Sequence, residues 1–170
     1  ASLGQKIGAE QSYVSRKQWF PKLAWLSPSS QTQKKNEGTK IGAQLARRYL
    51  SLYGAATTKD ISHFFGCKVS EAKVWVADLQ ANDQLINVQC GNRKSLLAMA
   101  NDADSLQDKP PTALTKWPIR LLPLWDSMMM GHHDKSWTVP NDADRKRIWR
   151  SGAYVAATII DRGRAVGIWT

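Results

Sequence analysis

Residues 40–54 read KIGAQLARRYLSLYG, and this stretch begins the pattern that decides the fold. Large apolar side chains recur in it at steps of three and four residues, which predicts an amphipathic helix buried along one stripe: Ile41, Leu45, Tyr49 and Leu52. Gly54 follows the last of these positions and is expected to end the helix.

Two shorter helices are expected directly downstream. The first covers residues 59–65, with a threonine as its cap and a glycine closing it. The second covers residues 71–81, with Ser70 as its cap. Its spacing predicts a buried face made of Ala72, Trp75, Val76 and Leu79.

A β-hairpin is expected next, because two alternating apolar runs, residues 85–90 and 95–99, flank a Gly-Asn-Arg-Lys turn. Three helices followed by a hairpin is the element order of a winged helix, in which a β-wing follows a helix-turn-helix. We therefore predict a winged-helix domain over residues 40–100. Residues 1–39 are expected to form an irregular lead-in segment.

The pattern changes after a polar, proline-containing linker over residues 101–116. Residues 117–170 are expected to form a small β-rich, barrel-like module, so that the fold class is α+β. Its expected elements are a buried strand over 119–125, a short helix over 142–149, and a hairpin of strands 154–160 and 165–169. The last strand stops in mid-run and no initiator Met is present, which predicts a fragment that lacks N- and C-terminal regions.

The charge indicates the kind of partner. The 170 residues contain 24 Lys and Arg against 14 Asp and Glu, a net charge of +10. The balance is +7 over residues 1–60, −1 over 61–110 and +4 over 111–170. Such a charge favours a polyanion as partner, with nucleic acid ahead of an anionic membrane surface. No run of eighteen apolar residues and no signal-peptide pattern occurs, and two cysteines are typical of a reducing, cytoplasmic protein.

Three segments together resemble a known family: LARRYLSLYGAAT at 45–57, IRLLPLWD at 119–126 and TIIDRGRAVGIW at 158–169. In the same order they look like the motifs of bacterial winged-helix DNA-binding proteins of the AlkZ/YcaQ type. The resemblance covers residues 40–170 and departs from the family pattern at Trp125, where Phe is usual. It implies tandem winged helices followed by a β-barrel. It also implies a DNA glycosylase that removes N-alkylated purines and, in some members, unhooks interstrand cross-links.

The resemblance also implies a catalytic Gln-X-Gln or Gln-X-Asp motif well upstream of the RRYL helix. Gln31-Thr32-Gln33 has that spacing, but it lies in a polar stretch, residues 27–38, with no apolar framework. A glycosylase must fix its water-positioning group in a pocket that receives a flipped nucleotide. We therefore predict that residues 27–38 form a solvated loop, and that the catalytic residues are unknown and outside this chain.

The candidate DNA-binding residues come from exposed positions. Lys73 and Gln80 lie on the outward face of the helix over residues 71–81, next to Glu71 and Asp78. Because base readout usually uses Arg, Asn or Gln in bidentate pairs, this composition favours phosphate contact or a structural role over direct base readout.

Five arginines and lysines complete the candidate set: Arg47, Arg93, Lys94, Arg145 and Arg147. Arg93 and Lys94 lie at the hairpin tip, where phosphate contact and a solvated turn are equally consistent with the sequence. Arg47 and Arg48 point about 100° apart on one helix, so we expect one to face DNA and the other to pair with an acid. Arg145 and Arg147 flank a basic stretch before Trp149, which suits backbone contact or is a solvated helix face.

No metal or cofactor site is predicted. Gly131-His-His-Asp134 has adjacent histidines, which converge poorly on one ion, and no Cys-x-x-Cys or His-x3-His spacing supports it. The expected partner is double-stranded DNA, bound by a monomer. Two alternatives stay open: a winged-helix transcription regulator without enzymatic activity, and a winged helix that binds an acidic protein.

Overall fold

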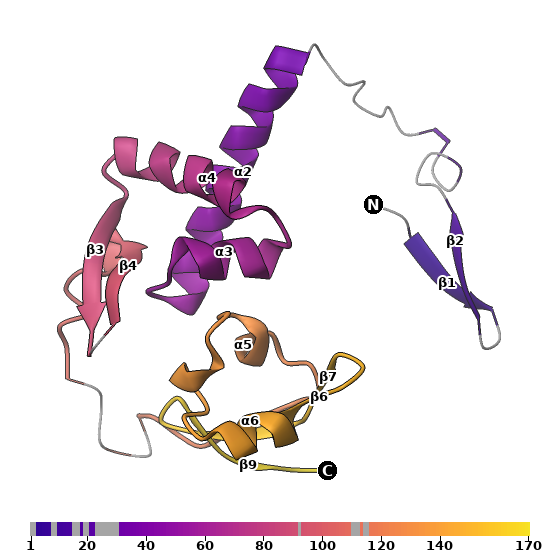
Figure 1. Cartoon of the computed structure of the whole chain (residues 1–170), viewed down its shortest axis with the longest axis vertical. Coiled ribbons are helices and arrows are strands. Elements are labelled where there is room, and N and C mark those ends of the chain that lie inside the picture. The colour runs from indigo at the N-terminus through magenta and orange to yellow at the C-terminus, as the bar shows by residue number, and fades with distance from the viewer. Residues whose placement is uncertain are drawn as a thin grey trace. The chain divides into compact units, whose positions relative to one another are not determined.

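The computed structural model describes residues 3–7, 10–14, 18, 21–22, 31–91, 93–109, 113 and 116–170. The chain divides into two compact units, Ala1–Asn36 and Glu37–Thr170. In the first unit, β1 (Leu3–Ile7) and β2 (Glu10–Val14) form an antiparallel hairpin (Figure 1). The lead-in segment was expected to be irregular, and this prediction is wrong for the hairpin.

The first long helix, α2 (Gln31–Tyr53), begins before its expected start at Lys40. Residues 31–38 are therefore helical, and the prediction of a solvated loop over them is wrong. Composition alone gave that prediction, because Gln, Lys and Asn in a row lack apolar periodicity although they tolerate a helix well. The predicted end is confirmed: Gly54 has φ +73°, and its N–H donates to the Leu50 carbonyl over 2.9 Å.

The buried face of α2 differs from the predicted stripe. Tyr49 is buried as expected, but Ile41 and Leu52 are 58% and 79% exposed, and Leu45 is also exposed. The buried positions are mostly small: Gly42, Ala43, Ala46, Tyr49 and Leu50. Small residues let another helix approach closely, and at Gly42 the Trp75 ring occupies the space of a side chain. The buried face of α2 is therefore the face that fits closely against the helix that carries Trp75, and not the face with the most large apolar side chains.

The approach of Trp75 to Gly42 gives a testable prediction. A Cβ at position 42 would lie 2.1 Å from Trp75 Nε1, and the ring is held against Phe65 at 6.0 Å between centroids. Gly42→Ala gains about 1 kcal/mol of helix propensity. Overpacking costs about 1–3 kcal/mol, and the rigid ring places the cost at the upper end. We expect a net loss of about 1–2 kcal/mol in the free energy of unfolding, measured by urea denaturation.

Gly38→Ala is the matched control for this substitution. Gly38 lies on the same helix, and a Cβ there meets no atom within 4 Å. It should stabilise the chain by up to about 1 kcal/mol. If both substitutions stabilised it equally, the close packing of Trp75 on Gly42 would be contradicted.

The next two helices follow the predicted pattern. In α3 (Thr58–Phe65), Thr57 is the cap and Gly66 ends the helix with φ +62°. In α4 (Val69–Ala81), the predicted apolar face is confirmed, since Ala72, Val76 and Leu79 are buried and Trp75 is partly buried. The predicted start is wrong: α4 begins at Val69 after Lys68, so Ser70 lies inside the first turn.

The predicted hairpin is confirmed as β3 (Leu85–Cys90) and β4 (Arg93–Met99), with Leu85 opposite Met99 and an irregularity between Val88 and Cys90. Ala56 exchanges two backbone hydrogen bonds with Leu97, of 2.9 and 2.8 Å, so the segment between α2 and α3 extends this sheet by one bridge. Buried side chains from α2, α3, α4 and the hairpin form one hydrophobic core.

The C-terminal part combines short helices and strands. Its elements are η1 (Ala100–Asp102), β5 (Arg120–Leu122), α5 (Ser127–Met130), η2 (Lys135–Trp137), α6 (Asp142–Ile148), β6 (Trp149–Arg150), β7 (Tyr154–Val155), β8 (Thr158–Asp161) and β9 (Arg164–Ile168). A second core forms from buried Met129, Val139, Ile148, Val155 and Ile160. The helix expected over 142–149 is confirmed as α6.

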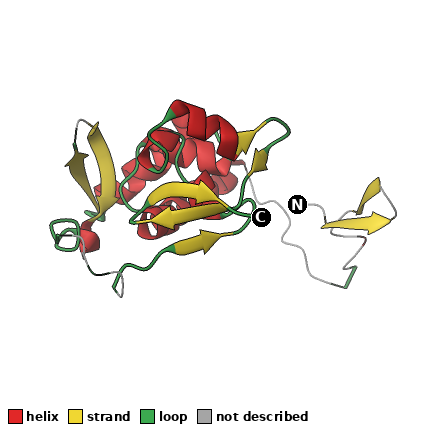
Figure 2. Cartoon of the chain, turned by 90° about the horizontal axis from the view of Figure 1, so that it is seen from below, coloured by secondary structure: helices red, strands yellow, loops and turns green. Residues whose placement is uncertain are grey.

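Two strand predictions need correction. The buried strand over 119–125 is the three-residue β5, and Ile119 and Leu121 are more than half exposed. The strand over 154–160 is divided, because Val155 pairs with β6 whereas β8 pairs with β5 and β9. Figure 2 shows the strands in separate small groups, and the described residues form no closed barrel. No helix in the described ranges has the length and apolar character of a membrane span.

Candidate nucleic-acid interface

The outward face of α4 carries two of the predicted contacts. Lys73 and Gln80 are both exposed, as expected, and Val74 between them is also exposed. Glu71 Oε2 accepts a hydrogen bond from the Lys68 N–H over 2.9 Å, so this acid is occupied in the first turn of the helix. The face therefore offers one amide and one ammonium group, which suits phosphate contact better than a base-reading row.

Arg93 and Lys94 begin β4 directly after the hairpin turn. Arg93 lies opposite Cys90, and Gly91 has φ +57°, a left-handed conformation that glycine adopts without strain. Both residues thus lie at the end of the hairpin, as predicted; their side chains lie outside the described part of the structure. A tip presents cations to a polyanion at little desolvation cost.

Arg47 and Arg48 are both exposed on α2. They border a shallow hollow of about 620 Å3 together with Gln44, Ser51 and Leu52. Neither guanidinium has an ion-pair partner among the described residues, so the expectation that one pairs with an acid is wrong. Two unpaired cations on one helix side add to the positive potential there.

Arg145 and Arg147 on α6 have different surroundings. The Arg145 guanidinium donates to the carbonyls of Val139 and Pro140 over 2.7 and 2.6 Å, and to Asp142 over 2.9 Å. These bonds hold the turn before α6. Arg147 is largely exposed and lies 3.9 Å from an Asp144 oxygen, a weak surface pair. The structure thus leaves Arg147 more available to a phosphate than Arg145.

A buried junction that the sequence did not predict links α3 to the loop before η2. Asp60 is 4% exposed and accepts hydrogen bonds from the Thr57 N–H and hydroxyl, over 2.8 and 2.5 Å, and from the His133 N–H over 2.8 Å. The Tyr49 hydroxyl donates to the Gly131 carbonyl over 2.8 Å. These bonds join residues 73 and 82 positions apart, so the helices and the C-terminal module form one unit.

The electrostatics of this junction follow from burial and from these bonds. Burial acts to raise the pKa of Asp60, but the hydrogen bonds from Thr57 and His133 outweigh it and hold this pKa below its usual value. Burial raises the pKa of Tyr49 well above its usual value, and the charge of Asp60 adds to that shift. Burial, with the charge of Lys135 and the neighbouring His133, lowers the pKa of His63. The only sequence signal for this junction was the Gly131-His-His-Asp134 segment.

The two histidines of that segment lie against other rings of the junction. No group of three or more metal-ligating residues occurs in the part of the chain that the structure describes. The His132 ring stacks on Trp137 at 5.7 Å between centroids, and the His133 ring meets His63 edge-on at 5.1 Å. Both histidines therefore pack the junction.

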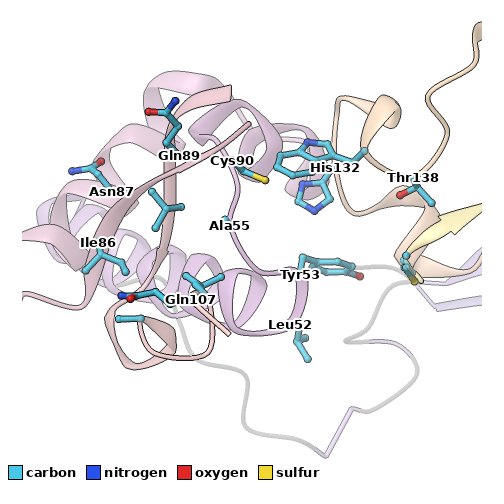
Figure 3. Close-up of a pocket in the computed structure, with 16 residues that line it drawn as sticks. Leu52, Tyr53, Ala55, Ile86, Asn87, Gln89, Cys90, Gln107, His132 and Thr138 are labelled. Carbon is cyan, nitrogen blue, oxygen red and sulfur yellow. The ribbon is translucent and has the colours of Figure 1, made fainter. Parts of the chain in front are cut away.

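A cavity of about 790 Å3 opens where β3 faces the end of α2 and the loop over residues 132–138 (Figure 3). Figure 3 shows Tyr53, Cys90 and His132 around it, each from a different segment. Neutral amides and apolar side chains make up most of the wall that the described residues form.

The structure places the predicted residues on α4, β4, α2 and α6, and their described side chains do not bond to one another. Arg47, Lys73, Gln80 and Arg147 are separate, exposed polar groups, and Arg145 is partly buried. Such an arrangement is typical of contacts to a phosphate backbone, which reads no sequence.

Comparison with known proteins gives one consistent result. A family model described as "DNA glycosylase AlkZ-like" matches residues 3–170. The interstrand DNA cross-link repair glycosylase of Streptomyces sahachiroi is 24% identical over 155 residues, 87% of this chain and 40% of that protein. The solved structure of the Streptomyces sahachiroi DNA glycosylase AlkZ matches with a TM-score of 0.70 at 19% identity, over 99% of this chain and 43% of that one. The chain thus spans about two fifths of these relatives.

Proposed function

The chain belongs to the AlkZ-like DNA glycosylase family, and from that premise we propose that it supplies the part of a DNA-repair glycosylase that holds double-stranded DNA. The resemblance based on the three motifs is confirmed, and the family match begins at residue 3, whereas the resemblance covered residues 40–170. This match is the observation that carries the proposal.

We propose that residues 40–100 act as a winged helix, with α4 as the helix nearest the DNA and β3–β4 as the wing. The order of three helices and a hairpin supports this assignment. Residues 101–116 then form a linker and residues 117–170 a β-rich module. The bonds of Asp60 and Tyr49 across this linker support a fixed geometry between the two parts.

The proposed mechanism of binding is electrostatic. Lys and Arg side chains replace counterions along the phosphate backbone, and the released ions drive association. The groups assigned to this contact are Arg47, Lys73, Gln80, Arg93, Lys94 and Arg147. Arg145 contributes indirectly, because it stabilises the turn before α6. The net charge of +10 supports the assignment. The proposed protein is a monomer that works in the bacterial cytoplasm and uses no cofactor for this contact.

Base excision is proposed for the whole protein, with N-alkylated purines or interstrand cross-links as substrates. The Streptomyces sahachiroi relative is named for cross-link repair, which supports this substrate class. The test uses the full-length protein and a duplex with one N7-alkylated guanine. An abasic site formed by the full-length protein supports the proposal. An intact duplex removes its main prediction and favours a regulator or a protein-binding winged helix.

The reactivity of Cys90 can show whether bound DNA covers the end of the hairpin. It is exposed and lies opposite Arg93, whereas Cys67 is partly buried and its pKa is raised by burial and by the charge of Glu71. In a Cys67→Ser variant, a thiol reagent therefore reports on Cys90 alone. We expect saturating duplex DNA to slow this reaction severalfold. An unchanged rate with DNA bound would show that the hairpin end is not in contact with it.

A further inference from the structure

A second cavity, of about 600 Å3, lies between the C-terminal half of α3 and the β6–β7 hairpin. We name it the α3–β7 cavity. The residues of its wall that matter to the argument are His63, Lys135, Trp149, Arg150 and Tyr154. Its volume is within the range of ligand sites in proteins.

Aromatic rings form one side of the α3–β7 cavity. Tyr154 meets Trp125 edge-on at 5.9 Å between centroids, and Trp125 Nε1 donates to the Ala153 carbonyl over 3.0 Å, so the Tyr154 ring is held in place. The buried Trp149 indole N–H has no acceptor within the described residues. That N–H is shielded from solvent, so it is not available to a bound molecule.

Two cations lie over these rings. The Arg150 guanidinium lies 5.1 Å from the centre of the Tyr154 ring, and its Nε donates to the Arg147 carbonyl over 3.0 Å. Lys135 Nζ lies 5.5 Å from the centre of the Trp149 ring and donates to the His132 carbonyl over 2.5 Å. No Asp or Glu is among the described residues that line the cavity. The Arg150 side chain is exposed at its rim, where its terminal nitrogens remain open to an anion.

We propose that the α3–β7 cavity binds one unstacked nucleotide of the DNA, with the base against the Tyr154 ring and a phosphate at Arg150. This inference rests on the proposed function. Ring and cation side by side are the two elements that bind single-stranded nucleic acid, because every base has a π-face and every nucleotide a phosphate. The described wall of the cavity in Figure 3 is made mainly of amide and apolar side chains, whereas the described wall of the α3–β7 cavity contains Arg150 and Lys135. An acidic peptide would use the cations but not the ring.

The test uses 2-aminopurine, a fluorescent base whose emission falls when it stacks on an aromatic ring. One probe is a duplex with a single unpaired 2-aminopurine, and the reference is the same duplex fully paired. We expect the chain to quench the unpaired base and to bind the bulged duplex more tightly than the paired one. Tyr154→Leu and Arg150→Ala should each weaken binding of the bulge about tenfold, because one stacked base contributes about 1–3 kcal/mol.

Two comparisons make the test specific. Both variants should bind the paired duplex within about twofold of the unchanged chain, whereas Lys116→Ala, an equal loss of charge at an exposed position, should leave binding of the bulge unchanged. Arg150→Ala changes an exposed side chain, so a folding defect does not obscure its result.

Each other outcome overturns the inference. If the paired duplex binds but the unpaired base is not quenched, the inference fails and the proposed function stands. If neither DNA binds, both fail. If Arg150→Ala weakens binding of an acidic peptide but not of the bulge, the α3–β7 cavity serves a protein partner.

Discussion

Asp60→Asn is expected to lower the free energy of unfolding by about 2–4 kcal/mol, because this carboxylate satisfies buried donors on two parts of the chain. It accepts from Thr57 at the start of α3 and from the His133 N–H on the loop before η2. The amide has nearly the same size, but it turns an NH2 group toward at least one of these donors. The loss therefore reports on hydrogen bonding rather than on packing.

The same substitution should change the pH dependence of stability. The pKa of Asp60 in the folded chain lies below its value in the unfolded chain, so the unfolded state takes up its proton first as the pH falls. The contribution of Asp60 is thus complete above the unfolded pKa of about 4 and is lost as the pH falls through the folded pKa. Urea unfolding between pH 7 and pH 3 should give a flatter curve for Asp60→Asn.

Asp104→Asn is the control for this prediction, since Asp104 is exposed in a turn. It should change stability by less than about 0.5 kcal/mol. A loss below 1 kcal/mol for Asp60→Asn, with an unchanged pH profile, would contradict the view that Asp60 joins the helices to the C-terminal module.

The second large effect is expected at the end of the wing. Replacing Arg93 and Lys94 together by alanine should lower the slope of log affinity against log salt by about 2, since each phosphate contact contributes about 0.9. At 0.1 M salt, the affinity for duplex DNA should fall about tenfold to a hundredfold. Fluorescence anisotropy at several salt concentrations gives both quantities.

A Lys109→Ala/Lys116→Ala variant has the same net charge and keeps the wing intact. Because both lysines are exposed in the segment after the hairpin, we expect its salt slope to change by less than 0.5, on the order of a screened long-range effect. Equal losses in the two double variants would mean that total charge, and not the wing, determines binding.

The sequence predicted well what depends on local chemistry. The apolar face of α4, the glycines that end α2 and α3, and the two strands of the hairpin follow from spacing, caps and turn residues. These signals act within a few residues, so a single sequence contains them completely. The basic residues chosen as DNA contacts remain predictions of the same local kind.

The errors have long-range causes. The buried face of α2 depends on how closely Trp75 approaches Gly42, which only the packed helices determine. The strand expected over 154–160 is divided because its beginning pairs with β6, whereas its end pairs with β5. The junction at Asp60 joins residues 73 positions apart, and nothing in the local pattern indicates that pairing.

The candidate DNA contacts could likewise be predicted where they depend on local chemistry, and could not where they depend on packing between distant segments. Exposed cations can be recognised from composition and turns, but the α3–β7 cavity forms from segments that begin 86 positions apart, at His63 and Trp149. The cavity contains two ring-and-cation pairs, Arg150 with Tyr154 and Lys135 with Trp149. These pairs depend on the packed structure and not on the local sequence pattern.

The most direct test of the central claim is the affinity of this chain for a short random-sequence duplex, measured by fluorescence anisotropy over a series of salt concentrations. We predict micromolar binding at low salt that weakens with a steep slope, because several phosphates are neutralised at once. Absence of binding even at low salt would contradict the claim, and the charge of +10 would then serve a partner other than DNA.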